Sequence, residues 1–349
     1  MSTAMSLETF HRLRELIYGK SGLEFPESKK YLLESRLQAR LAATHCQNFE
    51  EYYNLLRFDP QREKEALELF NCVTTNETFF FRDMAQVDCF RQIILPQIIK
   101  DRERIRKIRI WSAGCSSGEE PFTLAMIVTE EFPSLANWDV QIFATDLSEQ
   151  ILAVARRGVY GPYSIRNVPP NLLQKYFVQS EGHYTMGPSL RTLVKFSSVN
   201  LFDSLRMRSF QDIDIIFCRN VLIYFDQDAR RKIVTNFYDA LQDTGVLIIG
   251  FSESLSGVNR LFRPTPWNKT VMYHKADQAV PLTHASPIPA AIQSPSRPGM
   301  KSGVPVSGQG FGHSPLSSPL PTGVPSPQKL GTSLGNGSEE LKREPRWSR

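Results

Sequence analysis

Apolar residues recur at helical spacing in the first quarter of the chain. Leu33, Leu37 and Leu41, for example, fall on one face of a helix. Between residues 6 and 90 there is no strand-like alternation and no cluster of Pro and Gly. The pattern predicts a compact all-helical domain over residues 1–90.

From residue 108 onward, short apolar runs of strand length alternate with helical segments. The expected strands are 108–113, 140–145, 214–218, 246–250 and 271–274, and the expected helices are 119–132, 148–157 and 228–241. Such alternation implies a mostly parallel sheet with helices on both faces. We therefore expect an α/β domain over residues 91–275.

Two segments depart from this alternation. Residues 177–196 are rich in turn residues with short strand-like runs between them, which indicates a small antiparallel β-subdomain inserted near that position. From residue 276 the chain is rich in Pro, Ser and Gly, and 12 of the 23 prolines lie in the last 69 residues. This composition buries too little apolar surface to offset the cost of ordering, so we expect residues 276–349 to be a disordered tail.

Composition and charge exclude several classes of protein. The net charge of +5 comes from Lys and Arg scattered along the chain, so it gives no argument for nucleic-acid binding. The five cysteines fit no zinc pattern and include no CxxC, so we expect no metal site and a reducing, cytoplasmic location. The N-terminus is too polar for a signal peptide, and the apolar runs are too short to insert into a membrane.

The ends of the first two strands carry small and acidic residues. In a doubly wound sheet, ligands bind at the carboxyl ends of the strands. The loop 114–118, GCSSG, lets a ligand approach the backbone but is not GxGxxG, which disfavours an NAD-linked dehydrogenase. Asp146 follows the second strand, where a carboxylate can bind both ribose hydroxyls, although a helix-capping role would also explain it. A small-residue loop with a strand-end acid suggests a nucleoside without a pyrophosphate, such as S-adenosylmethionine.

Glu119 and Glu120 open the helix after that loop. Negative charge in a first helical turn gains about 0.3–1 kcal/mol from the helix dipole, which accounts for one of them without any ligand. Which of the two faces the ligand stays open, and we favour Glu120.

Two further segments place polar groups beside apolar ones. Asn76, Thr78 and Arg82 surround three consecutive phenylalanines, and Thr78 and Arg82 are expected on one helix face because they are four residues apart. After the strand 214–218, a ligand at the strand end could contact two polar side chains and the aromatic ring that follows: Arg219, Asn220 and Tyr224. A role as an ordinary buried aromatic is the alternative for Tyr224.

These segments resemble the chemotaxis receptor methyltransferases of the CheR family. The resemblance rests on NETFFFRD, IWSAGCSSGEEPFTLAM, FATDLSEQILAVARRGVY, FSSVNLF, IIFCRNVLIYFD and GFSESL, in this order, and covers roughly residues 6–275. It implies a helical domain packed on a Rossmann-like S-adenosylmethionine methyltransferase sheet with an inserted antiparallel β-subdomain. It also implies an enzyme that forms methyl esters on glutamates of chemoreceptor cytoplasmic domains, for sensory adaptation.

By position, the resemblance implies which side chains form the site. The residues expected to line the cofactor site are Asn76, Thr78, Arg82, Glu120, Asp146, Asn200, Leu201, Arg219 and Asn220. Asn200 and Leu201 would lie near the adenine, and Arg82 and Tyr224 would flank the reacting methyl group. Because a glutamate carboxylate is already ionised at neutral pH, no general base is needed.

The sequence says less about the residues that bind a partner than about the cofactor site. Lys29, Arg36 and Arg40 fall close to one helix face, and the resemblance points to this second helix as the docking element for an acidic receptor bundle. A solvated face without a partner would explain the same charges. The loop 179–184 looks shorter than in members that bind a receptor's tethering peptide, which argues against tethering.

Two other functions stay open beside the first. The chain could be a methyltransferase for another carboxylate substrate, or a non-catalytic adaptor that binds S-adenosylmethionine. We expect it to act as a monomer.

Overall fold

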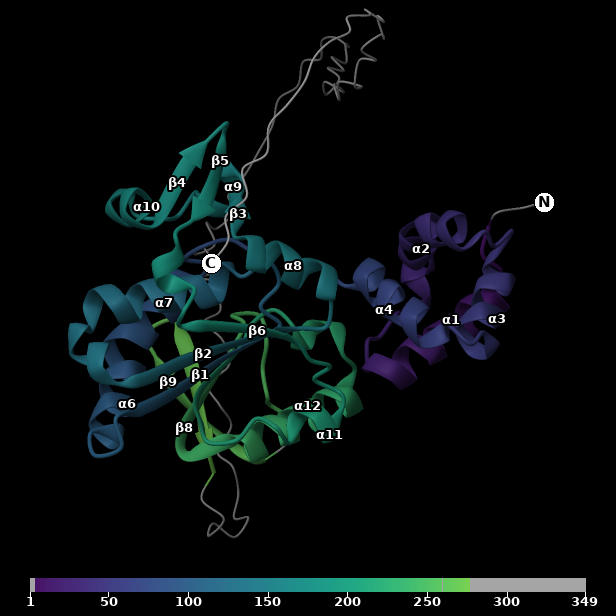
Figure 1. The fold of residues 1–349 in the computed structure, drawn as a ribbon. Coiled ribbons are helices and arrows are strands. Elements are labelled where there is room, and N and C mark those ends of the chain that lie inside the picture. The colour runs from purple at the N-terminus through teal and green to yellow at the C-terminus, as the bar shows by residue number, and fades with distance from the viewer. Residues whose placement is uncertain (1–3, 259, 277–349) are drawn as a thin grey trace, which may run out of the picture. The chain divides into compact units, whose positions relative to one another are not determined.

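The structure is a computed structural model that describes residues 4–258 and 260–276. Within these residues the chain forms a helical domain, a mixed β-sheet with helices on both faces, and a small inserted sheet (Figure 1). The expected disordered tail lies outside the described residues except for Ala276. Among the helices of the described chain, none has both the length and the apolar character needed to cross a membrane.

The helical domain contains four helices, and the apolar spacing predicted its helical character. They are α1 (Leu7–Ser21), α2 (Lys30–Thr44), α3 (Phe49–Phe58) and α4 (Arg62–Val73), and a short 3₁₀ turn, η1 (Glu27–Lys29), precedes α2. Leu33, Leu37 and Leu41 of α2 are all buried, which confirms their common face. α1 ends at Gly22, whose backbone adopts the left-handed conformation with φ of 74°.

The segment between α4 and the next helix corrects one expectation. Residues 74–83 form no helix, so Thr78 and Arg82 do not share a helix face. The backbones of Phe81 and Asp83 are left-handed, with φ of 54° and 56°, which no continuing helix allows.

Three helical segments follow this loop. They are α5 (Met84–Cys89), a π-helical stretch η2 (Phe90–Ile94) and α6 (Leu95–Arg102). Phe90 and Ile94 belong to the same hydrophobic cluster as Ile108 and Ile110 of the first strand. These helices therefore pack on the sheet, although they fall next to the helical domain in sequence.

The main sheet has seven strands in the order β6-β2-β1-β7-β8-β10-β9. Their bounds are β1 (Lys107–Ala113), β2 (Asp139–Asp146), β6 (Val194–Ser198), β7 (Ile213–Cys218), β8 (Leu241–Ile249), β9 (Phe262–Trp267) and β10 (Thr270–Lys275). The first five in this order pair in parallel, and β10 and β9 are antiparallel. The α/β prediction is confirmed.

Strand β9 was not predicted from the sequence. Its six residues include Pro264 and Pro266, which lack the N–H that a central strand needs. β9 is the edge of the sheet, where the missing donors need no partner, and prolines there also hinder pairing with other chains.

Helices cover both faces of the sheet. The longer ones are α7 (Glu119–Glu131), α8 (Glu149–Arg157) and α12 (Gln227–Ala240), with the short segments η3 (Pro133–Asn137), α11 (Ser204–Met207) and η5 (Leu222–Tyr224). Ser148 caps α8 as predicted, since its Oγ accepts a hydrogen bond from the Ile151 N–H at 3.2 Å.

A three-stranded antiparallel sheet is inserted between α8 and β6, as expected. It has the order β3-β5-β4 with β3 (Val159–Tyr160), β4 (Phe177–Ser180) and β5 (His183–Met186), and it carries α9 (Pro162–Ile165), α10 (Pro170–Tyr176) and η4 (Pro188–Leu190). The insertion begins earlier than the expected residues 177–196, and residues 194–196 belong to β6 of the main sheet.

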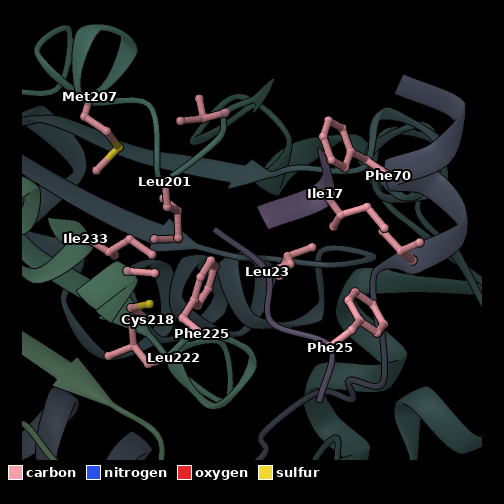
Figure 2. Packing of buried hydrophobic residues seen from close by; sticks show 14 of the residues in the cluster. Ile17, Leu23, Phe25, Phe70, Leu201, Met207, Cys218, Leu222, Phe225 and Ile233 are labelled. Atoms are coloured by element: carbon pink, nitrogen blue, oxygen red, sulfur yellow. The ribbon is translucent and has the colours of Figure 1, made fainter. Parts of the chain in front are cut away.

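The helical domain and one face of the main sheet share a hydrophobic core. Ile17 and Phe70 of the helical domain lie in the same buried cluster as Leu201 and Phe225, with Leu23 between the two groups (Figure 2). Burial of apolar surface contributes about 25 cal/mol per Å², so this continuity holds the two parts together.

Candidate functional site

A cleft with a cavity of about 350 Å³ opens at the carboxyl ends of β1, β2 and β7. Its other walls are the loop 74–82 and the segment 21–25 that follows α1. The volume falls in the range of small-ligand sites, and the position is where parallel sheets bind ligands.

All the catalytic and cofactor residues predicted from the sequence line this cleft. They are Asn76, Thr78, Arg82, Glu120, Asp146, Asn200, Leu201, Arg219, Asn220 and Tyr224. They come from five separate stretches of the chain, so the fold brings together what the sequence keeps apart.

The loop after β1 approaches its neighbours closely. Gly114 has φ of 81°, and a Cβ at this position would collide with a methyl group of Val221. The Gly114 N–H donates to the carbonyl of Thr145 at 2.7 Å, which joins the ends of β1 and β2. A larger residue at 114 would therefore displace the loop that lines the cleft.

Asp146, at the end of β2, is held by backbone donors. Its two carboxylate oxygens accept hydrogen bonds from the N–H groups of Ser116 at 2.9 Å and Ser148 at 3.0 Å. Burial raises the pKa of Asp146, and these backbone hydrogen bonds oppose that rise. A carboxylate has about four acceptor sites, so Asp146 retains capacity for two hydroxyl donors of a ligand.

The two glutamates at the start of α7 point to different surroundings. Glu120 lines the cleft, where it accepts hydrogen bonds from Ser112 Oγ at 2.6 Å and Arg219 at 3.0 Å. Glu119 is buried away from the cleft lining, accepting from Ser117 Oγ at 2.7 Å and Ser164 Oγ at 2.9 Å. Burial raises the pKa of Glu119.

Arg219 joins four groups around the cleft. Its guanidinium donates to Gln86 Oε1, to Glu120 Oε2 at 3.0 Å, and to both the Arg82 carbonyl and Asp83 Oδ2 at 2.8 Å. The side chain is only 5% exposed. Because the protein itself uses most of its donors, Arg219 braces the wall more than it offers contacts to a ligand.

Asn220, unlike Arg219, has a hydrogen-bonding group that the protein leaves unused. Its backbone is left-handed, with φ of 59°, and its side-chain Oδ1 is buried with no hydrogen-bond partner among the described residues. A buried acceptor without a partner costs free energy, so a ligand donor in the cleft would satisfy it.

Asn200 and Leu201 lie after β6, between the cleft and the helical domain. Asn200 Nδ2 donates to the Lys20 carbonyl at 2.7 Å, and its Oδ1 accepts from the Phe202 N–H at 3.1 Å. Leu201 is buried. The amide of Asn200 thus fixes the end of α1 to the sheet, and Leu201 offers an apolar surface to the cleft.

The loop 74–83 is anchored by its aromatic residues, and its polar residues are partly or fully exposed. The Phe80 N–H donates to the Ser164 carbonyl at 3.0 Å, and the Phe81 N–H donates to Thr123 Oγ1 at 3.1 Å. Arg82 is fixed more loosely, by one hydrogen bond of 3.0 Å to the Glu77 carbonyl and an ion pair of 4.0 Å with Asp83.

Tyr224 sits at the end of the loop after β7. Its carbonyl accepts a hydrogen bond from the Glu24 N–H at 2.9 Å, and Phe225 forms an isolated β-bridge with Leu23. The hydroxyl of Tyr224 has no hydrogen-bond partner within the described chain. The segment after α1 therefore positions this tyrosine through its backbone and leaves its hydroxyl available.

The three basic residues expected to bind a partner differ in their surroundings. Lys29 and Arg36 line the cleft. Arg40 instead donates to both carboxylate oxygens of Glu65, at 2.8 and 2.6 Å, inside the helical domain. Only 18% of the Arg40 side chain is exposed, and its charge is paired with Glu65.

Sequence reasoning missed the contribution of the helical domain to the cleft walls. Leu23, Glu24 and Phe25 line the cleft, although they carry no motif. Only the shared core and the bridge to Phe225 reveal them. Ser116 was also missed as a specific residue, yet its backbone N–H fixes Asp146.

The chemistry of the cleft fits a nucleoside that carries an ammonium group. Asp146 has acceptor capacity for ribose hydroxyls, and Asn220 Oδ1 is a buried acceptor without a partner. In the described part of the chain, His, Cys, Asp and Glu form no group that could hold a metal ion. The fold and this cleft define a methyltransferase that binds S-adenosylmethionine.

Comparison with known families agrees with this class. Residues 8–74 match the all-alpha domain of the CheR methyltransferases, and residues 76–271 match their S-adenosylmethionine-binding domain. The chain belongs to the CheR methyltransferase family. The two matches meet at the start of the loop 74–83, whereas the apolar pattern suggested a boundary at residue 90.

Curated relatives resemble the chain over most of their length. The chemotaxis protein methyltransferase 2 of Vibrio cholerae is 38% identical over 267 residues, which is 76% of this chain and 92% of the relative. The chemotaxis protein methyltransferase 1 of Pseudomonas aeruginosa is 34% identical, over 76% and 96%. The chemotaxis protein methyltransferase of Escherichia coli is 33% identical, over 74% and 88%.

Proposed function

We propose that this chain forms methyl esters on glutamate side chains of chemoreceptor cytoplasmic domains, as a protein-glutamate O-methyltransferase of chemotactic adaptation. The relatives are chemotaxis protein methyltransferases, and the chain covers nearly their whole length. The observation that carries the proposal is the lining of the cleft. It holds a cation, Arg82, and an unpartnered phenol, Tyr224, and no histidine lines the described cleft.

The absence of histidine from the described cleft lining agrees with a carboxylate acceptor. S-adenosylmethionine, when bound, supplies an electrophilic methyl group attached to a positively charged sulfur. The acceptor glutamate has a usual pKa of about 4.3 and is ionised at neutral pH, so no side chain has to remove a proton from it. The protein has to orient the reacting groups, which can be worth an effective concentration of about 10⁵–10⁸ M.

Arg82 and Tyr224 are suited to that orientation. The Arg82 guanidinium has one hydrogen bond to the protein, from Nη1 to the Glu77 carbonyl, and keeps donors for an incoming carboxylate. The Tyr224 hydroxyl can orient the carboxylate or the methyl group. In the proposed site Asp146 binds the ribose hydroxyls, and Asn200 and Leu201 lie near the adenine.

Receptor docking is proposed at the start of the second helix. Lys29 is exposed and has no ion pair among the described residues. Arg36 lies seven residues later, on α2, and lines the same cleft. Both can face an acidic helical bundle, whereas Arg40 is paired with Glu65 and is left out of the docking surface. We propose that the chain acts as a monomer in the cytoplasm, where its five free cysteines stay reduced.

The test is transfer of labelled methyl groups to purified chemoreceptor cytoplasmic fragments. We expect base-labile label on glutamate residues, and no label when the target glutamates are replaced by alanine. Binding of S-adenosylmethionine without transfer to receptor fragments would favour the adaptor function. Base-labile label on other proteins in a cell extract, with none on receptors, would favour another carboxylate substrate.

A further inference from the structure

The segment after β8, residues 250–255, has a sequence, GFSESL, to which no role has yet been assigned. Within it, the carboxylate of Glu253 accepts hydrogen bonds from three backbone N–H groups. Oε2 accepts from Gly250 at 2.6 Å and from Asn220 at 2.9 Å, and Oε1 accepts from Ile223 at 3.1 Å. Glu253 therefore ties the loop after β8 to the loop after β7.

One of these hydrogen bonds holds the backbone of Asn220, whose conformation needs support from its surroundings. Asn220 has a left-handed backbone with φ of 59°, a conformation that costs free energy in a residue other than glycine unless its surroundings hold it. Hydrogen bonds to an ionised acceptor are about twice as strong as those between neutral groups, so a carboxylate is well suited to this task.

The approach of the two loops leaves no room for a side chain at residue 250. A Cβ on Gly250 would lie 2.6 Å from Glu253 Oε2 and 2.7 Å from the Asn220 nitrogen. Gly250 and Glu253 thus act as a pair, in which the glycine permits the contact that the carboxylate makes.

This arrangement positions the side chain of Asn220, which has a hydrogen-bond acceptor that the protein itself does not use. Asn220 lines the cleft, and its Oδ1 is buried without a partner. A small rotation of the Asn220 backbone would move this acceptor relative to Asp146 and the remaining cleft wall.

We propose that Glu253 is a positioning residue for the cofactor site, which holds the Asn220 backbone so that its carboxamide can accept a hydrogen bond from the bound nucleoside. The proposal rests on the proposed function only in that the nucleoside is S-adenosylmethionine or its demethylated product, S-adenosylhomocysteine. It does not depend on the identity of the methyl acceptor.

The experiment measures S-adenosylhomocysteine binding by calorimetry, with the full chain. Glu253→Gln keeps the size of the side chain but has one acceptor oxygen, so at least one of the three N–H groups loses its partner. We expect affinity to fall about tenfold or more. Glu103→Gln removes the same charge at the exposed end of α6, just before the amino end of β1 and so at the opposite end of this strand from the cleft. It should bind as the parent chain does.

A double-mutant cycle separates positioning from a general effect on the fold. Asn220→Gly removes the carboxamide and tolerates the left-handed backbone, so it should weaken binding by itself. If Glu253 acts through Asn220, adding Glu253→Gln to Asn220→Gly should change affinity less than about twofold. Losses that multiply in the double variant would refute the proposal, as would unchanged binding by Glu253→Gln.

A second variant covers the case in which Glu253→Gln does not fold. Gly250→Ala retains the carboxylate but forces it away from the Asn220 nitrogen, and it should weaken binding to a similar extent. Parent-like affinity of Gly250→Ala would overturn the proposal. If the parent chain itself bound no S-adenosylhomocysteine, the proposed function would fail first, so the two failures can be told apart.

Discussion

Side chains of the cleft differ in how much of their hydrogen-bonding capacity the protein itself uses. Arg219 donates to four protein acceptors, whereas the Tyr224 hydroxyl and Asn220 Oδ1 have no partner in the described chain. Side chains with unused capacity are the better candidates for ligand contacts, because a buried polar group without a partner is costly. Sequence position alone could not make this distinction, since Arg219 and Asn220 are adjacent.

Arg82 and Tyr224, which line the cleft, should affect turnover without affecting the fold. Tyr224→Phe removes a hydroxyl that has no hydrogen bond within the described chain. Arg82→Ala removes one hydrogen bond to the Glu77 carbonyl and an ion pair of 4.0 Å with Asp83. We expect each variant to lower kcat about tenfold or more, which corresponds to about 1.4 kcal/mol in the barrier. The measurement is steady-state methylation of a receptor fragment, with thermal unfolding as the control for the fold. Parent-like turnover in both variants would remove them from the mechanism.

Arg219 should matter for stability. Removing one partner of a buried ion pair typically costs about 3–5 kcal/mol, because the other charges stay behind unpaired. We expect Arg219→Ala to lose an amount of this order in chemical unfolding, and Arg219→Lys to restore only part of it, since one ammonium cannot reach four acceptors.

The control for Arg219 is an arginine in an exposed ion pair. Arg231→Ala breaks the contact with Asp228, where the two side chains are 50% and 79% exposed, and should cost about 0–1 kcal/mol. A loss from Arg219→Ala no greater than that from Arg231→Ala would contradict the bracing role.

At the scale of elements, the start of α7 buries a carboxyl without a cationic partner. Glu119 has two serine hydroxyl donors and is almost fully inaccessible. Burial raises its pKa, so the folded chain holds its proton more tightly than the unfolded chain does. The parent chain therefore loses stability as the pH rises from the unfolded pKa of about 4.3 through the higher folded pKa.

Glu119→Gln should remove this pH dependence. A glutamine can keep both serine contacts, because a hydroxyl either donates or accepts. We expect the variant to gain stability relative to the parent chain between pH 4 and pH 8, as measured by urea unfolding across this range. Glu103→Gln, at an exposed position, should show no such trend, and a flat difference for Glu119→Gln would disprove the assignment.

Local patterns predicted most elements but missed those set by distant contacts. The helix spacing of Leu33, Leu37 and Leu41 and the cap at Ser148 are local, and both were correct. The loop 74–83 was expected to be helical, yet Phe80 and Phe81 donate their N–H groups to the inserted subdomain and to α7. No local pattern could reveal those partners.

At the scale of the whole molecule, the candidate site is built from both domains. The catalytic and cofactor residues of the sheet domain could be found in the sequence and all line the cleft. The segment 21–25 could not, because its role comes from its contact with residues about 200 positions later. The same holds for Arg40, whose partner Glu65 lies on another helix.

Docking of the receptor should depend on Lys29, the exposed basic residue just before α2. Lys29→Glu reverses an exposed charge beside the cleft, so we expect the KM for receptor fragments to rise several-fold and to become less sensitive to salt. The affinity for S-adenosylhomocysteine should change less than this KM does. Lys64→Glu makes the same reversal on α4, away from the cleft lining, and serves as the control. Equal effects of the two reversals would argue against docking at Lys29.

The joining of α1 to the start of α12 has a consequence for biosynthesis. Tyr18 donates a hydrogen bond to Asp226, which is 208 residues further along the chain. At about 5–20 residues per second, the ribosome needs roughly 10–40 s to deliver the second partner after the first. Throughout that interval the nascent helical segment carries an uncovered apolar face, so we expect it to be a client of chaperones that act on growing chains.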